Sequence, residues 1–194
     1  MLHPISKRDT TAYWQNLFSD EELDQILELC KALPVEEGTI GERKVEDNVR
    51  KSNVAWLKRN SDTEWIFARY DGAVHRTNSS FFCVDIDPLQ ILQFTVYDDD
   101  GGHYEWHWDM CYTPEPNDTR IVRQRKISVV TQLNGPEDYD GGVIEAAPCG
   151  EIFNIERKKG LSYMFLSFVN HRVTPVTKGI RYSLVGWYEG PDWR

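Results

Sequence analysis

The second half of the chain alternates short β-rich runs with clusters of turn residues. From about residue 81 onward, segments rich in valine, isoleucine, phenylalanine and tyrosine are separated by groups of glycine, proline, asparagine and aspartate. Many short strands at this spacing are typical of a sandwich or barrel of the jelly-roll kind. The expected strands are residues 81–86, 90–97, 103–109, 126–133, 143–146, 161–166 and 181–188.

Two helices are expected before this region. Ser19 is followed three residues later by Glu22, which is the pattern of a capping box, and apolar residues then recur at helical spacing until Pro34. A second start signal at residues 61–64, which read Ser-Asp-Thr-Glu, predicts a helix that ends near Asn78.

The segments around these helices complete a single domain. Residues 50–57 read as one strand, and residues 1–18 as an arm. Because helices come early and strands late, we expect the helices to pack on one face of the barrel. The interpretation is one mainly β (α+β) domain over residues 1–194, with a helical support region at 1–80 and a jelly-roll core at 81–190.

Charge, cysteine spacing and hydropathy disfavour several kinds of partner and site. With 31 acidic against 22 basic residues, the net charge of -9 repels a phosphate backbone, so no nucleic-acid partner is expected. The four cysteines form no CxxC pair, which disfavours a zinc knuckle or a redox dithiol. The sequence shows no apolar leader and no apolar run of about 18 residues, so we expect no membrane partner and a reduced, cytoplasmic protein.

A His-x-Asp pattern lies in one of the expected strands. Residues two apart in a strand point to the same side, so His107 and Asp109 present an imidazole and a carboxylate together, while Trp108 faces away. Such a pair supplies two of the three ligands of a facial triad, which leaves metal positions open for substrate and oxygen. A third ligand must come from elsewhere in the chain, and His171 is the best candidate.

A second polar pair follows His171. Arg181 lies ten residues beyond it, and Ser183 is two residues further along the same apolar strand. A guanidinium that points into a barrel is costly unless an anion meets it. Its planar fork matches a carboxylate, and Ser183 can donate one more hydrogen bond. A dicarboxylate that chelates a metal at one end and meets Arg181 at the other would satisfy both sites.

Alternation also suggests which side chains surround the open end of the barrel. Arg50, Ser52 and Trp56 occupy alternate positions of the strand at 50–57 and are candidates to line that opening. Trp106 and Trp108 flank the expected ligand His107, and one of them is a candidate for the substrate entrance, although packing is the favoured role for both.

In this order and spacing, the residues resemble the 2-oxoglutarate/iron(II) dioxygenases. More narrowly, they are similar to the small bacterial and phage members of the prolyl 4-hydroxylase-like branch. The resemblance runs from about residue 50 to residue 188. It is carried by Tyr97, by Tyr104-Glu105-Trp106-His107-Trp108-Asp109, by Gly141-Gly142, by His171 and by Arg181-Tyr182-Ser183.

The resemblance implies a double-stranded β-helix and a role for each polar residue named above. His107, Asp109 and His171 would bind the catalytic iron(II). Arg181, helped by Ser183, would bind the distal carboxylate of 2-oxoglutarate.

Two further residues complete the implied co-substrate site. Tyr97 would hydrogen-bond 2-oxoglutarate near its metal-chelating end. Gln132 occupies a strand position where some relatives carry a second co-substrate-binding tyrosine, so it is a candidate for the same contact.

The implied reaction consumes molecular oxygen, with ascorbate as an expected stimulant. It converts 2-oxoglutarate to succinate and carbon dioxide while a C–H bond of the substrate is hydroxylated. Halogenating relatives lack the carboxylate ligand, so Asp109 favours hydroxylation. The expected substrate is a prolyl residue in a peptide or protein, or free proline or a related small molecule.

Three other interpretations use the same residues. A nucleic-acid demethylase on this scaffold would carry a second arginine six residues after Arg181, where this chain has Trp187. A cupin-like metal-binding or sensor module would bind metal and release no succinate. A structural or interaction domain would leave Arg181 and Ser183 without an explanation. The sequence leaves the oligomeric state open.

Overall fold

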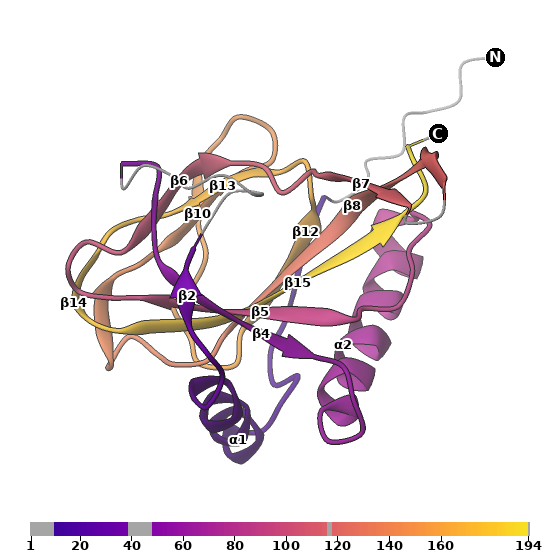
Figure 1. The fold of residues 1–194 in the computed structure, drawn as a ribbon. Coiled ribbons are helices and arrows are strands. Elements are labelled where there is room, and N and C mark those ends of the chain that lie inside the picture. The colour runs from indigo at the N-terminus through magenta and orange to yellow at the C-terminus, as the bar shows by residue number, and fades with distance from the viewer. Residues whose placement is uncertain (1–9, 39–47, 116–117, 194) are drawn as a thin grey trace.

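Two facing sheets form the barrel in the computed structural model, which describes residues 10–38, 48–115 and 118–193 (Figure 1). The large sheet contains β1 (Thr11–Trp14), β2 (Glu36–Glu37), β4 (Asn53–Lys58), β5 (Ile91–Tyr97), β7 (Tyr112–Glu115), β8 (Asp118–Gln132), β12 (Ser162–Leu166) and β15 (Arg181–Gly190). The small sheet contains β3 (Arg50–Lys51), β6 (His103–His107), β10 (Ile144–Ala147), β11 (Phe153–Asn154) and β13 (Asn170–Val173). A separate pair consists of β9 (Tyr139–Gly141) and β14 (Val176–Gly179).

The strand order confirms the predicted jelly roll. The large sheet runs β1-β12-β8-β15-β5-β4-β2, with β7 paired to β8, and the small sheet runs β11-β10-β13-β6-β3. Several neighbouring pairs, such as β8 with β15 and β6 with β13, join distant parts of the chain, as in a double-stranded β-helix. The mainly β fold class is therefore confirmed.

Both helices lie on the outer side of the large sheet, away from the small sheet (Figure 1). They are α1 (Asp20–Lys31) and α2 (Glu64–Thr77). Ile26 of α1 and Phe67 of α2 belong to one buried cluster with Phe94 of β5 and Leu184 of β15. Burial of this apolar face fixes the helices against the sheet and confirms that they pack on one face of the barrel.

The alternation of β15 divides its side chains between two environments. Leu184 and Tyr188 point to the helices and join their buried cluster. Arg181 and Ser183 have the opposite parity and line a cavity inside the barrel. The helices thus stabilise one face of this strand while the other face serves the site.

The first helix begins as the sequence predicts. The backbone N–H of Glu22 donates to the Ser19 hydroxyl (3.2 Å), and the backbone N–H of Ser19 donates to the Glu22 carboxylate (2.9 Å). The second helix also begins where it is expected, at Glu64, but no capping bond forms. The Thr63 hydroxyl donates instead to the Lys58 carbonyl (2.8 Å) and ties the helix start to the end of β4.

The strand predicted at residues 81–86 is wrong. Residues Asn78–Phe82 continue α2 as a π-helical turn (η1), which ends at Cys83 in the left-handed region (φ 54). The Asn78 side chain then bonds both backbone groups of Val84, at 2.7 Å to its carbonyl and 3.0 Å from its N–H. Phe82 is buried in the helix–sheet cluster, so tertiary packing overrides the β propensity of this aromatic run.

The strand predicted at residues 50–57 is divided at Ser52. Its first part, β3, pairs with β6 in the small sheet, and its second part, β4, pairs with β5 in the large sheet. The segment therefore crosses from one sheet to the other beside the opening of the barrel. In the predicted arm, residues 1–9 lie outside the described residues, whereas β1 pairs with β12 at the edge of the large sheet. No helix in the described residues is long and apolar enough to span a bilayer.

Candidate metal centre

Three potential metal ligands converge on one point inside the barrel. His107 at the end of β6 and His171 of β13 are directly paired in the small sheet, whose strands β6 and β13 lie side by side in Figure 1. Asp109 follows β6, where its backbone N–H donates to the Ser167 carbonyl (2.9 Å). The Asp109 carboxylate lies 3.7 Å from Nε2 of each histidine, and the ligand atoms of the three residues all lie within 4.8 Å of one another.

Backbone carbonyls orient both imidazole rings. Nδ1 of His107 lies 2.7 Å from the Glu105 carbonyl, and Nδ1 of His171 lies 3.0 Å from the Val169 carbonyl. Because a carbonyl oxygen only accepts, Nδ1 carries the proton in each ring. The lone pair is then on Nε2, which is the atom that faces Asp109, and this is the tautomer that a metal ion requires.

Burial and mutual charge set the protonation of these ligands. Burial, and then the neighbouring His171, lower the pKa of His107 to about 4. Burial acts to raise the pKa of Asp109, but the two histidines outweigh it, and the net pKa of Asp109 lies below its ordinary value. Near neutral pH the set therefore offers a neutral His107 and an ionised Asp109, the forms that coordinate a metal without first losing a proton.

This donor set fits iron(II). Two imidazole nitrogens and one carboxylate on one side of a metal leave its other positions open, as in the non-haem iron oxygenases. The open side faces a cavity of about 420 Å³, whose walls include Tyr97, Arg181 and Ser183. The residue types, the tautomers and the free volume are all compatible with a bound iron(II) and a small co-substrate.

Arg181 presents an anion site in the same cavity. Its side chain is only 1% exposed, and one guanidinium nitrogen, Nη1, lies 3.3 Å from the Ser183 hydroxyl. The other two nitrogens, Nε and Nη2, are buried and have no hydrogen-bond partner among the described residues. A buried guanidinium with two unmet donors is strongly destabilising on its own, and a carboxylate in this cavity would satisfy both donors.

Two neighbours shape the space around Arg181. Gly142 has a left-handed backbone (φ +59), and a Cβ there would lie 2.8 Å from Cδ of Arg181, so glycine leaves room for the side chain. Tyr97 is paired with Arg181 across β5 and β15, and the guanidinium lies 5.3 Å from the centre of its ring. Burial raises the pKa of Tyr97, so its phenol keeps the proton and can donate into the cavity.

Gln132 does not line this cavity. It pairs with Ser183 in the large sheet, but its amide is occupied elsewhere. Nε2 donates to the Glu156 carbonyl (2.5 Å), and the Tyr139 hydroxyl donates to Oε1 (3.2 Å). The placement therefore does not support the co-substrate contact expected for Gln132, and it gives the residue a bridging role between β8 and neighbouring segments.

Several residues at the site are not singled out for chemistry by the sequence. Arg125 lies over the Trp187 ring (4.0 Å) and its buried Nε has no partner within the described part of the chain, although both residues line the cavity. Tyr104 stacks on His107 with ring centres 3.5 Å apart. The Arg50 guanidinium lies over the Tyr104 ring, 4.7 Å from its centre.

The expected opening of the barrel is confirmed in part. Arg50 and Trp56 line the cavity, whereas Ser52 accepts a hydrogen bond from Nε of Arg50 (2.8 Å) without lining it. Trp108 also lines the cavity and is 62% exposed, so it stands at the entrance, whereas Trp106 does not line the cavity.

The chain combines a double-stranded β-helix with two histidines, one aspartate and a buried arginine that lacks an anionic partner in the described residues. This combination is typical of the jelly-roll non-haem iron oxygenases. Residues 92–189 match the family model of the 2OG-Fe(II) oxygenase superfamily. The chain belongs to this superfamily, which confirms the resemblance seen in the sequence and its iron(II) and 2-oxoglutarate cofactors.

The chain is also similar to curated proteins that are named PKHD-type hydroxylases. The chain is 35% identical over 116 residues to a PKHD-type hydroxylase from Azoarcus sp. (strain BH72). The match covers 58% of this chain and 48% of that protein, so the chain spans about half the length of this curated relative.

Two solved structures share the fold over nearly the whole chain. A prolyl-4-hydroxylase from Pseudomonas putida has a TM-score of 0.76 at 19% identity and covers 96% of this chain and 95% of its own. A prolyl hydroxylase from Trichoplax adhaerens, in complex with a peptide fragment of hypoxia inducible factor, has a TM-score of 0.73 at 20% identity and covers 92% of this chain and 83% of its own. At these identities the likeness is one of fold.

Proposed function

We propose that this chain is an iron(II)- and 2-oxoglutarate-dependent hydroxylase. The observation that carries the proposal is the position of Arg181, whose unmet donors open on the same cavity as the three ligand atoms in the described structure. A metal site alone suits many functions. A metal site and a carboxylate site in one cavity of about 420 Å³ suit a chelating dicarboxylate.

In this proposal each residue has a defined task. His107, Asp109 and His171 hold iron(II), and Arg181 with Ser183 holds the distal carboxylate of 2-oxoglutarate. The bound metal and co-substrate together would supply the activation of oxygen, with succinate and carbon dioxide as co-products. The protein's part is to fix geometry and to exclude water from the site.

The second part of the proposal concerns the substrate. We expect a prolyl residue of a peptide or protein, or free proline. The aromatic rings of Trp56, Trp108 and Trp187 border the cavity and offer flat apolar surfaces to a pyrrolidine ring. The prolyl hydroxylases of similar fold, one of them bound to a peptide fragment, are consistent with this class.

The rival functions are less compatible with the site. A nucleic-acid demethylase would need a second arginine where Trp187 stands, and the net charge of -9 opposes a phosphate backbone. A metal-binding module without turnover would have no use for the anion site at Arg181.

Turnover in air tests the proposal. Iron(II)-loaded protein with ascorbate and 2-oxoglutarate is assayed for succinate alone, with a proline-rich peptide and with free proline. We expect slow succinate release without substrate, and faster release with mass-detected hydroxylation for one of the two proline forms. Iron-loaded protein that forms no succinate under any of these conditions would contradict the hydroxylase proposal. Faster succinate release with neither proline form would contradict the substrate class alone.

A further inference from the structure

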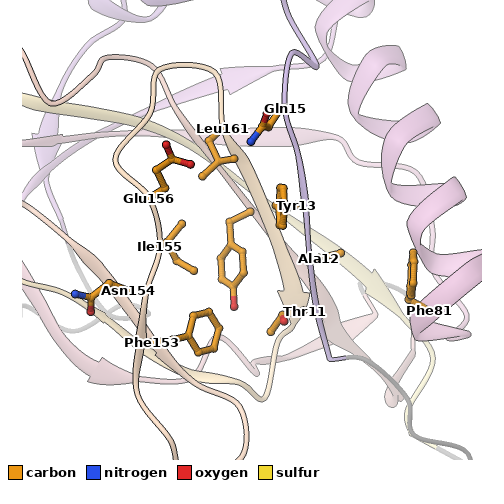
Figure 2. Close-up of a pocket in the computed structure, with 11 residues that line it drawn as sticks. Thr11, Ala12, Tyr13, Gln15, Phe81, Phe153, Asn154, Ile155, Glu156 and Leu161 are labelled. Atoms are coloured by element: carbon orange, nitrogen blue, oxygen red, sulfur yellow. The ribbon is translucent and has the colours of Figure 1, made fainter.

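A second cavity of about 590 Å³ lies at the edge of the barrel, and Figure 2 shows the residues that line it. Thr11 and Tyr13 of β1 stand on one side of it, and Phe153 and Ile155 stand on the other. Tyr163 of β12 also lines it. None of its lining residues lines the metal cavity, so it is a separate site that the hydroxylase proposal does not use.

The ends of the two sheets create this cavity. β1 is the last strand of the large sheet, and β11, which contains Phe153, is the last strand of the small sheet. Tyr13 is paired with Tyr163, and paired residues of neighbouring strands share a face, so both rings lie on the barrel side of the sheet. The two sheets do not close over this gap in the described residues, and the space between their edges stays open.

Aromatic side chains surround the gap while remaining partly in water. Tyr13 is 67% exposed, Phe81 of the π-helical turn is 44% exposed and Phe153 is 37% exposed. Isolated exposed aromatics are common on protein surfaces, but three around one hollow form an apolar patch of the kind that receives a ligand.

Thr11, Gln15, Asn154 and Glu156 are polar residues of the lining, and the phenol of Tyr163 is its buried donor. Tyr163 is 3% exposed, and its hydroxyl has no close hydrogen-bond partner in the part of the chain that the structure describes. Burial raises the pKa of Tyr163 well above its ordinary value, and a long hydrogen bond from the Thr11 hydroxyl to the phenol oxygen lowers it only in part. The phenol therefore keeps its proton, and no acceptor for that proton lies within hydrogen-bond distance in the described residues.

We propose that this cavity binds a small, uncharged and largely apolar molecule that accepts a hydrogen bond from the Tyr163 hydroxyl through a carbonyl oxygen. Its volume is that of a site for a small organic ligand. Glu156, which also lines the cavity, places a carboxylate beside it and disfavours an anion. The walls supply apolar contact, and the one buried donor supplies orientation.

Nile red is a suitable probe, because it is uncharged and carries a ring carbonyl. Its fluorescence is titrated with the full chain at neutral pH. We expect saturable binding to one site. Tyr163→Phe removes only the hydroxyl and keeps the ring that stacks on Phe165, so it should weaken Nile red binding about 3- to 10-fold, as for the loss of one hydrogen bond. Phe153→Ala removes one wall and should also weaken binding.

Matched variants locate the probe. Tyr182→Phe removes a phenol on the helix side of the large sheet, and Phe168→Ala removes a comparably exposed ring that packs on Trp193, so neither should change the affinity. Thermal unfolding of each variant confirms that it folds. N-Phenyl-1-naphthylamine, an uncharged probe without a carbonyl, should bind equally well to the protein with and without Tyr163→Phe.

Three results would overturn the proposal. Nile red affinity could be unchanged in both Tyr163→Phe and Phe153→Ala. It could fall only in Trp108→Ala, which would place the probe in the metal cavity. The Nile red fluorescence could also disappear as the protein concentration rises, while sedimentation velocity detects dimers. That result would assign the cavity to a second copy of the chain.

Discussion

Replacement of Arg181 by glutamine gives the most informative prediction. In the described structure the guanidinium has two buried nitrogens without a partner, and in the proposed complex both would donate to the distal carboxylate of 2-oxoglutarate. Two charge-assisted hydrogen bonds contribute about 3–6 kcal/mol, and a glutamine amide restores about 1 kcal/mol. The net loss of at least about 2 kcal/mol corresponds to a dissociation constant raised about 30-fold or more.

The same substitution should have the opposite effect on the free protein. Without an anion, Arg181 is a cation that is only 1% exposed, and a neutral amide removes its desolvation cost. The melting temperature of Arg181→Gln in the absence of 2-oxoglutarate should therefore equal or exceed that of the wild type, although most buried substitutions destabilise by about 1 kcal/mol.

Calorimetry of 2-oxoglutarate binding to zinc-loaded protein measures the predicted loss of affinity in Arg181→Gln without turnover. Arg172→Gln is the matched control, because Arg172 lies on β13 next to His171 but forms an ion pair with Glu145 (2.7 Å) and does not line the cavity. The control should bind 2-oxoglutarate as the wild type does. An affinity of Arg181→Gln within about threefold of the wild type would refute the assignment of the carboxylate site.

Four further predictions concern the remaining parts of the account. His107→Ala should weaken zinc binding on the order of 100-fold in a chelator competition; retained affinity would remove it from the ligand set. Tyr97→Phe should weaken 2-oxoglutarate binding about 2- to 10-fold with metal affinity unchanged, and an equal effect on both would indicate a packing role. Gly142→Ala should weaken 2-oxoglutarate binding, because its new methyl group would press on the arginine side chain; Gly150→Ala, also at positive φ (+90) but with open space around it, is the control and should not. Ser19→Ala should lower the free energy of unfolding by about 1 kcal/mol in urea without changing 2-oxoglutarate affinity, since it removes only the cap of α1.

Strand periodicity explains only part of the site. Arg181 and Ser183 are two apart on β15, so alternation places them on one side. His107 and Asp109 are also two apart, but the strand predicted at residues 103–109 ends at His107, and Asp109 is placed by the bond from its backbone N–H to the Ser167 carbonyl. The fold class follows from the same alternation combined with turn residues. The approach of His171 to His107, by contrast, depends on the pairing of β6 with β13, which no local pattern encodes.

Features that depend on irregular pairing could not be predicted. Arg125 meets Trp187 only because the register of β8 and β15 shifts between Tyr188 and Glu189. The strand at residues 50–57 changes sheets at Ser52, and this position carries no glycine or proline to mark it. In each case tertiary contacts decide the outcome, and a one-residue shift moves a side chain to the opposite face.

Gln132 illustrates the complementary limit. Its position in β8 beside Ser183 is compatible with a contact to the co-substrate, as the resemblance implies. The bonds that occupy its amide come from Tyr139 and Glu156, which lie in segments that follow β8 in the chain. A sequence pattern identifies a position on a strand, but it does not show which neighbours satisfy the side chain.

The central claim is that the three ligands and Arg181 serve one and the same co-substrate. Anaerobic titration of iron(II)-loaded protein with 2-oxoglutarate tests it most directly, because chelation of iron(II) by a 2-oxo acid produces a visible charge-transfer band. The account predicts a saturable band in the wild type, its loss in Asp109→Ala, and a need for about 30-fold more 2-oxoglutarate in Arg181→Gln. Absence of the band in iron-loaded wild-type protein, or an identical titration for Arg181→Gln, would contradict it.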